Sequence, residues 1–63
     1  MGFYPTIVDY ICTRLREGAA DSTITQEVMR TDEPLFIPIN NDLGVAISYL
    51  AYAKKVRPAI GVR

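Results

Sequence analysis

The sequence predicts a small α+β domain in which two helices pack with a β-hairpin. Two stretches, residues 6–17 and 41–56, place apolar residues at helical spacing. Between them, residues 23–31 and 35–39 are rich in Thr, Ile, Val and Phe, and a turn-like Thr-Asp-Glu-Pro sequence at 31–34 separates them. We therefore expect one domain, 1–63, in the order helix, β-hairpin, helix and short C-terminal strand or arm.

The first predicted helix covers Thr6 to Glu17. Pro5 suits the first turn of a helix, where its missing N–H costs nothing, and Gly18 suits a left-handed C-cap. The residues of its apolar arc are Ile7, Val8, Ile11, Cys12 and Leu15. We expect Cys12 to be a small buried apolar side chain, because the chain has no second cysteine to pair with it and no histidine to activate it.

Residues 23–31 have two interpretations. Thr, Ile and Val in rough alternation favour a strand, whereas Thr23 and Gln26 fit a helix-start capping box. The strand is preferred because the turn at 31–34 and the apolar run at 35–39 would complete a hairpin. Pro38 cannot donate to a strand ladder, so the second strand is expected to lie at an edge or to end there.

The helix expected over residues 42–56 is apolar on two sides. With side chains placed at intervals of about 100°, one arc is expected to face the core and comprises Leu43, Ala46, Ile47, Leu50, Ala51 and Ala53. The nearly opposite arc comprises Val45, Tyr49, Tyr52 and Val56. No charge occurs from residue 43 to residue 53, although a surface helix normally has a charged face. Either both arcs are internal, or the second arc meets another subunit or another protein.

The tyrosines favour partner contact, because Tyr combines apolar area with a polar tip and is enriched at interfaces. Gly44 and Ser48 lie four residues apart and would let another backbone approach closely. The predicted partner-interface residues are Gly44, Val45, Ser48, Tyr49, Tyr52 and Val56. A chain of this length buries too little surface to be robust alone, so we expect a homo-oligomer or a larger assembly.

Polar residues mark both ends of this helix. Asn40, Asn41 or Asp42 is expected to cap its start, and Pro58 is expected to stop it. The basic C-terminal end suits the helix dipole and also offers candidate phosphate contacts, Lys54, Lys55, Arg57 and Arg63. A small nucleic-acid-binding protein is therefore one alternative function, and a small inhibitor of another protein is a second.

The residue types argue against catalysis, a cofactor or a metal site. The chain has no histidine, its four glycines are scattered, and one cysteine is too few for a zinc site. The apolar run at 43–53 falls short of the ~20 residues that a membrane span needs, and no secretory signal is recognised. We expect a non-enzymatic cytoplasmic protein with no membrane partner and no small-molecule substrate.

Two segments carry a resemblance to a known family. The sequence PLFIP at Pro34–Pro38, followed by AISYLAYAKK at Ala46–Lys55, resembles the later part of tailed-phage head-completion or head–tail adaptor proteins. The resemblance covers residues 34–55, about a third of the chain. It implies ring-forming protomers held together by helix faces, a structural viral protein without enzyme activity, and a location in the virion.

Overall fold

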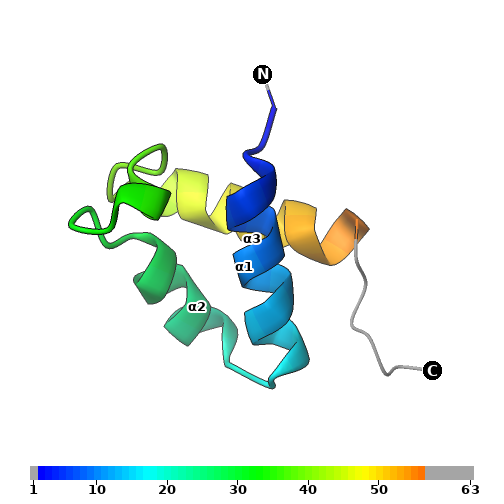
Figure 1. Ribbon diagram of the computed structural model, residues 1–63. Helices are drawn as coiled ribbons and strands as arrows, with labels where there is room; N and C mark the ends of the chain where they lie inside the picture. The colour runs from blue at the N-terminus through cyan, green and yellow to red at the C-terminus, as the bar shows by residue number, and fades with distance from the viewer. Residues whose placement is uncertain (1, 57–63) are drawn as a thin grey trace.

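The computed structural model describes residues 2–56. These residues fold into helices joined by short loops (Figure 1). Its elements are α1 (Pro5–Arg16), α2 (Asp21–Val28), the 3-10 helix η1 (Pro34–Phe36) and α3 (Leu43–Val56). Residues 2–56 contain no strand, so the predicted α+β class and its hairpin are wrong, and the described domain is all-α. The predicted strand or arm at 57–63 lies outside the described residues.

The three helices enclose one core. α1 crosses α3, and α2 packs against both (Figure 1). The loop that carries η1 closes the end of the core between α2 and α3. The buried apolar side chains come from all four elements and the loop before α3: Ile7, Val8, Ile11, Cys12, Ile24, Val28, Phe36, Ile39, Ala46, Tyr49, Leu50 and Ala53.

The prediction for α1 is confirmed in its essentials. Pro5 occupies the first turn, and Gly18 adopts a φ of 89° just after the helix. The Gly18 N–H donates to the carbonyl of Leu15 at 3.0 Å and the Ala19 N–H donates to that of Arg14 at 3.1 Å. This pair of bonds is a Schellman motif, which satisfies carbonyls that the helix end leaves free. Cys12 is buried in the core, as expected.

The strand prediction for residues 23–31 is wrong because helical spacing decides the packing. Ile24 and Val28 lie four residues apart, and both point into the core from one face of α2. The helix begins at Asp21 with Ala20 as its N-cap, three residues earlier than a capping box at Thr23 requires. Thr25 is accommodated within it, because its Oγ1 donates to the Asp21 carbonyl at 2.8 Å.

The strand prediction for residues 35–39 is also wrong. A strand would place residues 35, 37 and 39 on one face, but the buried side chains are Phe36 and Ile39, which are three residues apart. Leu35 and Ile37 are exposed instead. The spacing of three is that of a 3-10 turn, and Pro34 favours its start with a fixed φ.

Asn40 and Asn41 redirect the chain into α3. Both adopt left-handed conformations, with φ of 55° and 57°, which Asn tolerates better than most residues. Of the three predicted cap candidates, Asp42 caps the helix, since its Oδ1 accepts the Val45 N–H at 3.2 Å. Its carbonyl accepts the Ala46 N–H at 2.9 Å, the first bond of the helical ladder.

α3 is rotated relative to the predicted core arc. Its buried residues are Ala46, Tyr49, Leu50 and Ala53. Leu43 and Ile47, which were expected in the core, are 54% and 51% exposed. The small side chains of Ala46 and Ala53 are fully buried, which allows α1 to lie close to α3. Tyr49 is buried because the N-terminal segment covers it.

Candidate protein-binding site

An apolar groove runs between the N-terminal segment, the loop before α3 and the first turns of α3. It has a volume of about 700 Å³. It is lined by Gly2, Phe3, Tyr4, Pro38, Asp42, Gly44, Val45, Ser48 and Tyr49. Asp42 is the one charged residue of this lining. The groove therefore offers an apolar floor with a single carboxylate at its rim.

The N-terminal segment forms one wall of the groove by packing on the tyrosines of α3. The Phe3 ring meets Tyr49 edge-on, with centroids 4.9 Å apart, and stacks on Tyr52 at 4.2 Å. The Tyr4 N–H donates to the Tyr49 Oη at 2.8 Å. These contacts hold residues 3 and 4 against α3, although they lie 45 residues away along the chain.

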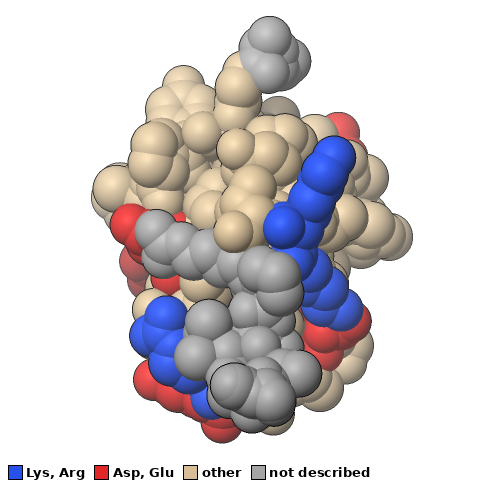
Figure 2. All heavy atoms as spheres, turned by 90° about the vertical axis from the view of Figure 1, so that its right-hand side faces the viewer, with Lys and Arg blue, Asp and Glu red and all other residues tan. Residues whose placement is uncertain are grey.

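α3 itself remains exposed over much of its circumference. Four of its positions, Gly44, Ser48, Ala51 and Lys55, are exposed and follow a 4–3–4 spacing that places them on one line along the helix. We call these four residues the seam. Leu43 and Ile47 border the seam on one side, and Tyr52 and Val56, which are 37% and 45% exposed, border it on the other. Figure 2, which looks toward the C-terminal end of α3, shows uncharged atoms over the upper part of this face, with Lys, Arg, Asp and Glu side chains beside and below them.

The structure brings most of the predicted interface residues together. Gly44, Val45 and Ser48 line the groove, and Tyr52 and Val56 continue its α3 side toward the C-terminal end of the helix. Tyr49 also lines the groove, but it is only 4% exposed and belongs to the core. The second arc predicted for α3 is thus divided between core and surface.

The predicted phosphate contacts do not form a cluster in the described residues. Lys54 Nζ bonds to Asp21 Oδ2 on α2 at 2.6 Å, so its charge is already paired. Lys55 makes no ion pair with residues 2–56. Arg57 and Arg63 lie outside the described residues.

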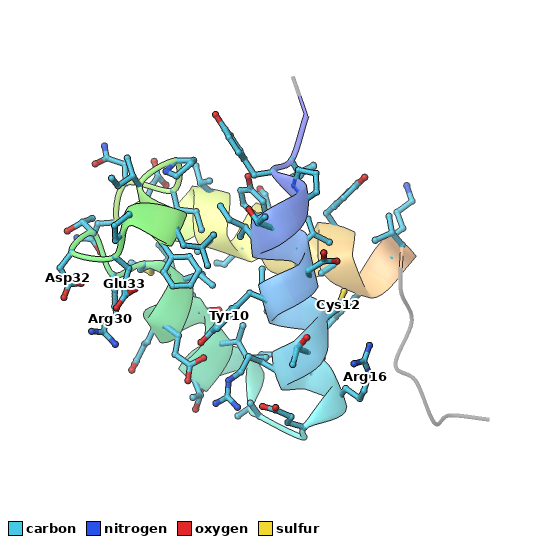
Figure 3. All side chains as sticks on the ribbon, in the orientation of Figure 1. Tyr10, Cys12, Arg16, Arg30, Asp32 and Glu33 are labelled. Atoms are coloured by element: carbon cyan, nitrogen blue, oxygen red, sulfur yellow. The ribbon has the colours of Figure 1, made fainter. Side chains whose placement is uncertain are left out.

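A second polar cluster lies between α1 and α2, away from the groove (Figure 3). Arg14 bonds to both carboxylate oxygens of Glu27, at 3.0 and 2.9 Å, and the Tyr10 hydroxyl donates to Glu27 at 2.7 Å. The Arg14 hydrogen bonds lower the pKa of Glu27, and burial together with the Glu27 hydrogen bond raises the pKa of Tyr10. The cluster joins two helices, and each of its polar groups has a partner.

Sequence reasoning missed five residues that line the groove: Gly2, Phe3, Tyr4, Pro38 and Asp42. Phe3 and Tyr4 were interpreted only as an apolar lead-in before Pro5, because their partners are on α3, at the other end of the described chain. Asp42 was predicted as a cap but not as the acidic rim. A detectable signal existed in the aromatic pair next to a helix-starting proline, since such residues need apolar partners elsewhere in the fold.

In residues 2–56, no three acidic or cysteine side chains lie together in a way that could hold a metal ion. None of the helices in these residues has the length and apolar character of a membrane span. No family model, no curated protein and no solved structure matches the chain. The fold and the groove therefore define the class by themselves: a small three-helix domain with an exposed apolar helix beside an apolar groove.

Proposed function

We propose that this chain is a non-enzymatic assembly protein that associates with further copies of itself through the exposed side of α3. The observation that carries the proposal is the apolar character of that exposed side. Leu43, Ile47, Tyr52 and Val56 are each more than a third exposed, and α3 carries no charge before Lys54. A solvated helix normally has a charged outer face, and exposed apolar surface of this kind is typical of interaction sites.

Two further considerations support the same role. A chain of 63 residues gains little stability from its own core, so association adds burial that the monomer lacks. The resemblance of residues 34–55 to phage head-completion and head–tail adaptor proteins favours an assembly function, with the virion as the location. The alternative of nucleic-acid binding has less support, because Lys54 is paired with Asp21.

The test is the solution mass of the wild-type protein by light scattering from about 1 µM to 1 mM, a range that covers weak association. We expect the mass to rise with concentration. Tyr52→Ser should weaken the association by at least about tenfold, because exposed Tyr residues often dominate interface energies. Leu35→Ser is the matched control: Leu35 is 38% exposed, similar to Tyr52, but borders a separate hollow beside Tyr10 and Phe36.

We expect Leu35→Ser to change the association constant by less than about twofold, within the usual range for a residue outside an interface. A wild-type protein that stays monomeric at 1 mM would overturn the proposal. Equal effects of the two substitutions would also contradict it, because the association would then not depend on α3.

A further inference from the structure

We infer that the partner on this surface is a second copy bound as a two-fold antiparallel pair of α3 helices, in a register fixed by Asp42 and Lys55. The inference rests on the proposed self-association and specifies its geometry. It starts from the seam, whose 4–3–4 spacing is that of residues facing a partner helix in a coiled coil. Three of its four members, Gly44, Ser48 and Ala51, are small, so the two helix axes can approach to about 8 Å.

The seam is self-complementary when the helices are antiparallel. A two-fold axis midway between Ser48 and Ala51 places Ser48 opposite Ala51 of the second copy, and Gly44 opposite Lys55 of the second copy. The only long side chain of the seam then lies over its smallest residue. Because the contact is two-fold, each such pair occurs twice.

Charge complementarity selects this register. A Cβ placed on Gly44 would lie 3.3 Å from Asp42 Oδ1, so the Asp42 carboxylate sits beside the point that Lys55 of the second copy would reach. Asp42 accepts a backbone N–H from Val45, but it makes no ion pair with a side chain of residues 2–56. Lys55 is unpaired within the same residues. The pairing therefore joins an acid and a base that the described fold leaves without opposite charges.

The groove gives the same arrangement an apolar contact. Two-fold symmetry places like flanks of the two helices on the same side of the pair, so Tyr52 and Val56 of one copy lie along the groove of the other. Along the helix axes, Val56 of one copy then lies beside Asp42 and Gly44 of the second copy, and Tyr52 lies beside Ser48 of the second copy. Both are exposed, and the lining of the groove by Phe3, Tyr4, Pro38 and Val45 is apolar.

The test is an exchange of the two charges. Lys55→Glu and Asp42→Lys each place like charges at both ends of the pair, and each should raise the dimer dissociation constant by at least about tenfold. An equimolar mixture of the two variants should restore the wild-type constant within about threefold, because a mixed dimer regains an opposite-charge pair at each end. Arg16→Glu makes the same change in net charge as Lys55→Glu, on the exposed side of α1, away from the groove (Figure 3), and should not raise the dissociation constant in this way.

The cap at Asp42 needs its own control. If circular dichroism shows that Asp42→Lys loses helix, the charge exchange is replaced by a double-mutant cycle of Asp42→Asn and Lys55→Met. Asn at position 42 removes the charge but retains the capping oxygen. The double variant should then be no weaker in association than the weaker single variant. Additive effects would overturn the register.

The outcomes separate the two proposals. A wild-type monomer at all concentrations overturns self-association, and with it the register. A wild-type dimer that both charge reversals leave unchanged, or whose loss the mixture does not restore, overturns only the register. If light scattering shows assemblies larger than a dimer, the closed two-fold pair is overturned, but the proposal of self-association stands.

Discussion

Tyr49 and Tyr52 lie three residues apart on α3, yet we expect their truncation to have different consequences. Tyr49→Ala removes a side chain that is 4% exposed and whose hydroxyl accepts the Tyr4 N–H. Loss of a buried aromatic side chain costs about 3–5 kcal/mol, and the lost hydrogen bond adds about 1 kcal/mol. Since a domain of this length has a total stability of about 3–9 kcal/mol, Tyr49→Ala should leave the protein largely unfolded at 25 °C.

Tyr52→Ala should instead remain folded. Its ring is 37% exposed, and its aromatic contact is the stack on Phe3 at 4.2 Å. Loss of such a pair costs about 1 kcal/mol beyond the burial of its area, and the partial burial of the side chain adds about 1–2 kcal/mol. Tyr49→Phe, which keeps the ring and removes only the hydroxyl, should cost about 1 kcal/mol.

The assay is urea unfolding followed by far-ultraviolet circular dichroism. All variants are compared at one low protein concentration, because association would otherwise add stability to the wild type. The free energies of unfolding should fall in the order wild type, then Tyr49→Phe, then Tyr52→Ala, then Tyr49→Ala. A Tyr49→Ala protein as stable as Tyr52→Ala would refute the assignment of Tyr49 to the core.

Two further predictions concern the C-terminal end of α1 and the ionic contact between α1 and α2. Gly18→Ala should cost about 1 kcal/mol of folding stability, because φ at Gly18 is 89° although an added Cβ would meet nothing within 4 Å; an unchanged urea midpoint would contradict this. The lowered pKa of Glu27 means that its ionised form stabilises the fold above the ordinary glutamate pKa of about 4.3, and that this contribution is lost as pH falls through the lower folded value. Urea midpoints of Glu27→Gln measured from neutral pH downward should therefore show a shallower acid decline than those of the wild type, and parallel declines would count against the Arg14 contact.

The sequence was most informative where the signals are local. The start of α1 at Pro5, its end at Gly18 and the cap of α3 at Asp42 were each predicted from residues within one helical turn. Caps and turns depend on backbone conformations that one residue type favours. Such signals are therefore readable without knowledge of the rest of the fold.

The two strands at residues 23–31 and 35–39 were predicted wrongly because the composition of these segments does not distinguish the two periods. Ile24 and Val28 fit helical spacing, but the surrounding threonines fit a strand equally well by propensity, and packing against α1 and α3 decides between them. The same limitation applies to Phe36 and Ile39. Short apolar runs of this length cannot be assigned by periodicity alone.

The candidate site was predicted in part for a similar reason. The sequence indicated that α3 has more apolar surface than one core can bury, and exposed Leu43, Ile47, Tyr52 and Val56 agree with that surplus. It could not indicate the rotation of α3, because the rotation depends on Phe3 and Tyr4 covering Tyr49. That contact joins opposite ends of the described chain and leaves no local trace.

The long separation between Tyr4 and Tyr49 also bears on the order of folding. α1 and α2 are joined by four residues, so their contacts close a short loop, whereas α3 docks on α1 only after a much longer loop has closed. Residues 3 and 4 can complete their wall of the groove only when Tyr49 is in place. A chain in which α3 has not docked therefore lacks the groove, and any recognition that uses the groove is restricted to molecules in which α3 has docked.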